Sequence, residues 1–115
     1  MRMIALFFFA VLSLLPAFAA ASGYGAIALN SETGRYGYAY NQQSRASAEV
    51  TAQSHCGANC RPILWFANGC AALAQSANRF GAGVAQSPAV AERKALNTCG
   101  MGRCRIVLSQ CSGKY

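Results

Sequence analysis

Short stretches of alternating apolar and polar residues divide the chain into two successions of the same elements. In the first, residues 26–29 form an apolar strand, and a polar turn ending at Gly34 separates it from the strictly alternating residues 35–40. Alternation with a period of two beside a turn predicts a β-hairpin. Residues 71–75 and 79–84 predict a second hairpin in the same way.

Each predicted hairpin is followed by a predicted helix, over residues 45–55 and 88–98. Ser44 and Ser87 are suitable N-caps, and Pro88 suits the first helical position. Small residues recur at every fourth position of each helix: Ala48, Ala52 and Cys56, then Ala91, Ala95 and Cys99. Such a face lets a helix approach a sheet closely, but it buries little apolar area. We therefore expect crosslinks to stabilise the core.

A third apolar run follows each helix, at residues 63–66 and 106–108. Both runs are predicted to be central strands that are buried on both faces, with Trp65 and Phe66 in the core. The predicted fold is α+β: a duplicated ββαβ unit with pseudo-two-fold symmetry, in which a mainly antiparallel sheet carries two helices on one face.

Residue matches at offsets of 43 and 44 support the duplication. The matched pairs are Arg35-Tyr36-Gly37 with Arg79-Phe80-Gly81, Ala48-Glu49 with Ala91-Glu92, Cys56-Gly57 with Cys99-Gly100, and Cys60-Arg61 with Cys104-Arg105. Cys70 is then matched with Cys111. The copies span about residues 24–70 and 71–111.

The N-terminus has the pattern of a secretory signal peptide. An apolar run over residues 3–15 follows Arg2, and Ala17-Phe18-Ala19 then supplies an A-x-A cleavage site. The alternative, a membrane anchor, is disfavoured because the run is short for a bilayer. We expect residues 1–19 to be removed, leaving residues 20–115 as one secreted, cysteine-rich domain.

Charge and composition restrict the chemistry. The net charge of the 115-residue chain is +7, from 10 basic and 3 acidic residues, with no aspartate. The acids are Glu32, Glu49 and Glu92, and His55 is the one histidine. A Ser-His-Asp triad is excluded because the chain has no aspartate. An EF-hand and a two-metal site are excluded because the chain has too few carboxylate ligands. We expect no cofactor and no metal.

Six cysteines in a small exported domain predict three disulfides. They are Cys56, Cys60, Cys70, Cys99, Cys104 and Cys111. The repeat favours Cys56–Cys60, Cys99–Cys104 and Cys70–Cys111, the last joining equivalent points of the two copies. The crossed pairs Cys56–Cys104 and Cys60–Cys99 respect the symmetry equally. Zinc binding by the closely spaced cysteines is the disfavoured alternative.

Several segments together resemble domain-of-unknown-function family 4189. They are Tyr24-Gly25-Ala26-Ile27-Ala28, Gly34-Arg35-Tyr36-Gly37-Tyr38, Ala48-Glu49 leading to Cys56-Gly57, Trp65-Phe66-Ala67-Asn68-Gly69-Cys70-Ala71-Ala72-Leu73-Ala74, and Ala95-Leu96 leading to Cys99. The resemblance covers about residues 23–111. It implies a small exported bacterial protein, with some mycobacterial members acting as secreted effectors, and it supplies no catalytic residues.

Two groups of side chains are candidates for binding a partner. Tyr36, Tyr38 and Tyr40 share one face of a predicted strand, as rigid amphipathic contacts do. The alternative is that this face packs under a helix. The basic candidates are Arg35, Arg61, Arg103 and Arg105. Nucleic acid is not expected as the partner, because no recognised motif accompanies these charges. A protein or an acidic envelope component fits better.

The leading hypothesis is an exported, disulfide-stabilised, non-enzymatic binding module of the bacterial periplasm or extracellular space, of an inhibitor or immunity type. One alternative is a secreted effector acting on a host cell. A second is a small hydrolase using His55 or the matched Glu49 and Glu92. For these three residues the simpler interpretation is a charge that complements a helix dipole.

Overall fold

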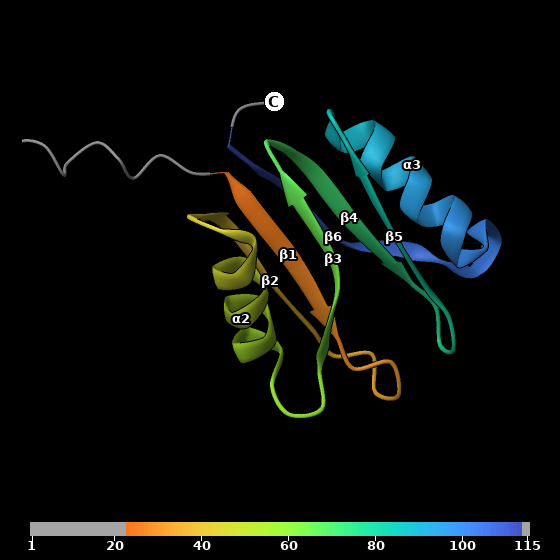
Figure 1. Cartoon of the computed structure of the whole chain (residues 1–115). Helices are drawn as coiled ribbons and strands as arrows, with labels where there is room; N and C mark the ends of the chain where they lie inside the picture. The colour runs from red at the N-terminus through yellow and green to blue at the C-terminus, as the bar shows by residue number, and fades with distance from the viewer. Residues whose placement is uncertain (1–22, 114–115) are drawn as a thin grey trace, which may run out of the picture.

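The computed structural model describes residues 23–113 (Figure 1). The predicted signal peptide lies outside the described residues. The elements, in order, are β1 (Tyr24–Leu29), β2 (Tyr36–Gln42), α2 (Arg45–Cys56), β3 (Arg61–Ala67), β4 (Gly69–Gln75), β5 (Phe80–Ala85), α3 (Pro88–Cys99), the 3₁₀ turn η3 (Met101–Arg103) and β6 (Arg105–Ser112). This is the predicted ββαβ order, present twice.

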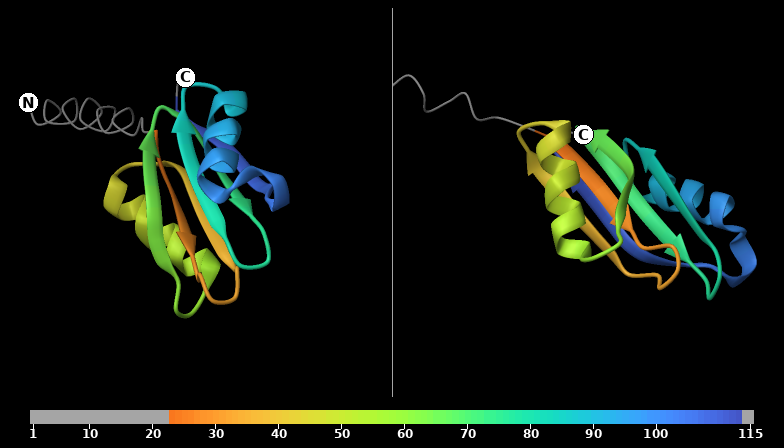
Figure 2. Two further views of the ribbon diagram at one scale, coloured as in Figure 1. Left: turned by 90° about the vertical axis from the view of Figure 1, so that its right-hand side faces the viewer. Right: turned by 60° about the horizontal axis from the view of Figure 1, so that its bottom comes forward.

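The strands form two antiparallel, three-stranded sheets, in the orders β2-β1-β3 and β5-β4-β6. Helix α2 packs on the outer face of the first sheet and α3 on the outer face of the second (Figure 1). The views in Figure 2 show the strands between the two helices. The layers therefore run helix, sheet, sheet, helix. The duplicated α+β fold is confirmed, but the expected single sheet with both helices on one face is corrected to two sheets.

The first strand of each unit explains this arrangement, because it is buried on both faces. In β1, Ala26 and Ala28 pack under α2, whereas Ile27 and Leu29 face the other sheet. In β4, Leu73 faces the first sheet in the same way. Two sheets that each have a large apolar face bury more area by stacking than by continuing side by side.

The third strands are edge strands, and the prediction that they are central is wrong. Among the strands of residues 23–113, β3 pairs with β1 alone, and β6 pairs with β4 alone. Phe66 of β3 is buried between the sheets, but Trp65 is 42% exposed. Neighbouring side chains of a strand point to opposite faces, so Trp65 points to the face that carries α2. Since β3 is an edge strand, Trp65 lies at the edge of that face, beside α2. There it stacks on Tyr24, and Arg45 lies over its ring at 4.8 Å.

The helices begin and pack as the sequence predicts. The Ser44 hydroxyl accepts a hydrogen bond from the Ser47 amide at 3.0 Å, and Ser87 accepts one from Val90 at 3.3 Å. The buried residues of the helices are the predicted small ones: Ala48, Ala52 and Cys56 of α2, and Ala91, Ala95 and Cys99 of α3. Each helix therefore lies close to its own sheet.

The three disulfides are Cys56–Cys60, Cys70–Cys111 and Cys99–Cys104. The two short ones tie the end of each helix to the following strand. Cys70 and Cys111 lie directly opposite each other in β4 and β6. This third bond therefore crosslinks two strands of the second sheet, and does not join equivalent points of the two copies.

Candidate binding surface

The two β-turns and the two loops that follow the helices lie at one end of the molecule, which we call the hairpin end (Figures 1 and 2). It comprises residues 30–35, 57–61, 76–79 and 100–105. The Gln75 side-chain amide donates a 2.9 Å hydrogen bond to the Gly34 carbonyl, and thereby joins the two turns. The hairpin end is thus one continuous surface built by both units.

Five of the seven arginines in the described part of the chain lie at the hairpin end. They are Arg35, Arg61, Arg79, Arg103 and Arg105, and all are exposed. Glu32 is the one carboxylate there, since Glu49 and Glu92 lie on the helices. The salt bridge found among residues 23–113 joins Arg45 to Glu49 on α2. Most of the excess positive charge of the described residues is therefore at one end, without ion pairs.

Arg35 and Arg79 occupy equivalent places against the ends of the helices. A Cβ atom on Gly57 would lie 3.1 Å from Nη2 of Arg35, and one on Gly100 would lie 2.6 Å from Nη2 of Arg79. A cation at a helix C-terminus complements the negative end of the helix dipole. These two arginines thus have a structural contact in addition to their exposure. Arg79 was not among the sequence candidates, although its match with Arg35 was a usable signal.

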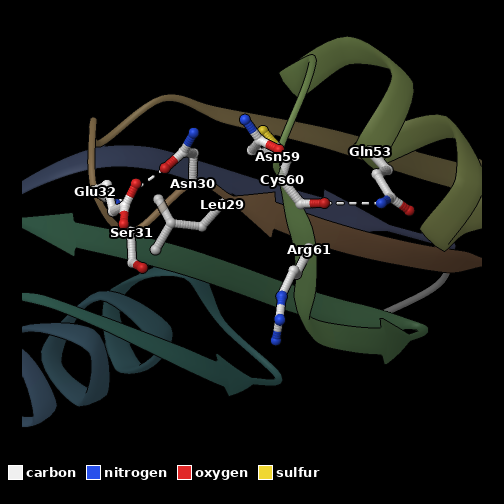
Figure 3. Close-up of a pocket in the computed structure, with 8 residues that line it drawn as sticks. All are labelled: Leu29, Asn30, Ser31, Glu32, Gln53, Asn59, Cys60 and Arg61. Carbon is white, nitrogen blue, oxygen red and sulfur yellow. Dashed lines mark hydrogen bonds between the residues drawn. The ribbon is translucent and has the colours of Figure 1, made fainter.

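Arg61, Arg103 and Arg105 make no salt bridge or side-chain hydrogen bond within the described residues. Figure 3 shows Arg61 on β3, beside an open hollow with mostly polar walls. Glu32 lies on the far side of this hollow, and its side chain does not reach Arg61 (Figure 3). Arg103 and Arg105 border another hollow together with Ser76. These three guanidinium groups are free to contact a partner.

The tyrosines do not form an open face, nor do they pack under a helix. Tyr36 and Tyr38 are half-buried at the interface between the sheets, because Gly37 and Ala39 take the helix side of β2. The Tyr36 hydroxyl donates a 3.1 Å hydrogen bond to the Val107 carbonyl. Tyr40 is 43% exposed, stacks on Tyr38, and lies toward the other end of β2. The structure therefore separates the exposed tyrosine from the arginines.

The residues considered for catalysis are also kept apart. Glu49 is paired with Arg45 at 3.0 Å, and Glu92 accepts a 2.7 Å hydrogen bond from Ser109. The two glutamates lie on helices at opposite sides of the molecule, so they do not form an acid–base pair. The His55 Nδ1 atom lies 3.2 Å from the Tyr38 carbonyl oxygen, in an exposed position.

Residues 23–113 contain no cluster of three or more side chains suited to hold a metal ion. All six cysteines are in disulfides and are not available as zinc ligands. Within the same residues, no helix has the length and apolar character needed to cross a membrane. The crosslinks fit a periplasmic or extracellular protein.

The fold and its crosslinks define a small, duplicated, disulfide-stabilised α+β domain. Residues 24–111 match the model of a family described as a domain of unknown function, DUF4189. The chain belongs to this family, as its motifs indicated.

The chain is also similar in sequence and in structure to known mycobacterial proteins. The chain is 37% identical over 83 residues to protein Rv1269c of Mycobacterium tuberculosis and to protein Mb1300c of Mycobacterium bovis. The match covers 72% of this chain and 66% of those proteins, so this chain spans about two thirds of their length. The NMR structure of Rv1813c from Mycobacterium tuberculosis is similar, with a TM-score of 0.62 and 29% identity, over 78% of this chain and 75% of that one.

Proposed function

We propose that the protein is an exported, non-enzymatic binding module that holds an anionic partner against the hairpin end, in the periplasm or outside the cell. The observation that carries the proposal is the clustering of five arginines with one carboxylate at that end. Unpaired exposed charges of one sign steer an oppositely charged partner and favour its binding.

The scaffold supports this role. The Cys56–Cys60 and Cys99–Cys104 disulfides close the loops that follow the helices, and a hydrogen bond joins the two turns, so the arginine-bearing loops are held in fixed relative positions. A preorganised surface loses little conformational entropy when it binds. An inhibitor or immunity protein is one form that such a module takes.

The test compares two double charge reversals. Arg103→Glu with Arg105→Glu changes the hairpin end, whereas Arg93→Glu with Lys94→Glu makes the same change of net charge on the exposed side of α3. On immobilised heparin, used as a defined polyanion, we expect the first variant to elute at a clearly lower salt concentration than the second. Equal elution of the two variants would overturn the proposal, because only net charge would then matter. Circular dichroism verifies that both are folded.

A further inference from the structure

The two units differ in the loop between the short-range disulfide cysteines. The first unit closes its disulfide with Gly57-Ala58-Asn59, and the second closes the matching disulfide with Gly100-Met101-Gly102-Arg103. The first unit shows that this closure requires neither a large apolar residue nor an arginine. Met101 and Arg103 are therefore not explained by folding of the loop.

The conformation of Met101 strengthens this point. Its φ is 51°, in the left-handed region, and its side chain is 53% exposed. In the first unit Asn59 has the left-handed conformation, with a φ of 62°. Asparagine and glycine adopt this region at lower cost than methionine. The protein thus holds an apolar side chain in water at a position where a polar residue would be more stable.

A second exposed apolar side chain lies at the same end. Phe80 is 39% exposed, whereas its counterpart Tyr36 is half-buried and hydrogen-bonded. Arg79 precedes Phe80, and its guanidinium lies against Gly100, the neighbour of Met101. The second-unit part of the hairpin end therefore places Met101 near the cations Arg79 and Arg103, whereas Phe80 shares the face of β5 that turns toward the first sheet.

We propose that this second-unit end docks on the surface of an anionic phospholipid bilayer, an inference that rests on the binding role proposed above. The arginines contact lipid phosphates, and Met101 enters the boundary between headgroups and acyl chains. Anionic lipid attracts each nearby basic residue, and shallow burial of apolar side chains adds to the affinity. A soluble polyanion would use the arginines but would leave the Met101 side chain in water.

The decisive variant is Met101→Asn, which keeps the net charge and introduces the residue type that suits the left-handed conformation. We expect it to fold, and to bind vesicles of phosphatidylcholine and phosphatidylglycerol about tenfold more weakly than the parent in sedimentation. Val50→Asn is the matched control, because Val50 is 66% exposed on α2. It should bind vesicles as the parent does.

Two further measurements separate the electrostatic contribution to vesicle binding from the insertion of an apolar side chain. Arg103→Gln should weaken vesicle binding about fivefold, and pure phosphatidylcholine vesicles should bind the parent poorly. The fluorescence of Trp65, the single tryptophan, should not shift on binding, because Trp65 lies toward the opposite end of β3.

The outcomes distinguish this inference from the proposed function. Unchanged vesicle binding by Met101→Asn, or a shift of Trp65 emission, would overturn the docking geometry. Retention on heparin without binding to anionic vesicles would remove the lipid partner and leave the proposed function standing. If Met101→Asn also lost heparin affinity, the apolar contribution that we assign to Met101 would be contradicted.

Discussion

At the scale of single residues, glycines of β2 and β5 set the distance between each sheet and its helix. A Cβ atom on Gly37 would lie 2.4 Å from the Ala52 carbonyl oxygen and from the Cys56 amide nitrogen of α2. A Cβ atom on Gly81 would lie 2.3 Å from the Cys99 amide nitrogen of α3. These contacts are with backbone atoms, which cannot move aside as a flexible side chain can. The glycine of the repeated Arg-aromatic-Gly sequence is therefore required sterically, because any larger residue would overlap the helix backbone.

We expect Gly81→Ala to lower the free energy of unfolding by about 1–3 kcal/mol, because the added methyl group forces the helix away from the sheet. Urea denaturation measures this loss. Gly102→Ala is the control, since a Cβ atom at Gly102 meets nothing within 4 Å. A similar small effect for both variants would contradict the close-approach argument.

The candidate site shows what residue patterns can and cannot predict. The basic candidates Arg35, Arg61, Arg103 and Arg105 were visible from charge alone, and the structure places them at one end. The tyrosine pattern correctly placed three rings on one side of a strand, but alternation does not say what covers that side. Met101 was not singled out, because its significance depends on its φ and its exposure.

At the scale of elements, local signals predicted the hairpins and helices well. Serine N-caps, glycine after each helix and the four-residue spacing of small residues all act within one segment, so the sequence alone reveals them. The partition into two sheets depends on contacts between distant strands. The apolar run of β3 does not reveal whether it has one neighbouring strand or two, and this is why its edge position was missed.

Removing an N-cap tests whether the serine hydroxyl helps to define the start of a helix. Ser87→Ala removes the side-chain oxygen that accepts from the Val90 amide, and we expect it to cost about 1 kcal/mol of unfolding free energy. Ser54→Ala, at an exposed position within α2, should change stability by less than about 0.5 kcal/mol. Thermal denaturation followed by circular dichroism compares the two. A neutral Ser87→Ala would show that Pro88 and packing alone define the start of α3.

At the scale of the whole molecule, small and large buried side chains occupy different layers of the core. Alanines and cysteines fill the two helix–sheet layers, whereas Ile27, Leu29, Phe66, Leu73 and Leu108 meet between the sheets. The small-residue layers bury little area for each residue, so the disulfides contribute much of the stability.

The disulfides differ in how far along the chain they reach. Cys70–Cys111 spans 41 residues, whereas Cys56–Cys60 spans 4. Chain-entropy arguments then predict that replacing both Cys70 and Cys111 with alanine costs about 4 kcal/mol, against about 2 kcal/mol for the Cys56 and Cys60 pair. Guanidinium denaturation of the two double variants measures this difference. Equal losses would mean that strain or local packing, and not loop length, determines what each bond contributes.

Asn68 alone connects the last strand of the first unit with the first strand of the second. A gene encoding one unit would produce a chain whose isoleucine, leucine and phenylalanine side chains require a twin to cover them. Two such chains would associate only at sufficient concentration, and would separate on dilution. Fusion through one residue makes that encounter intramolecular, so the joined halves stay together at any dilution of the protein.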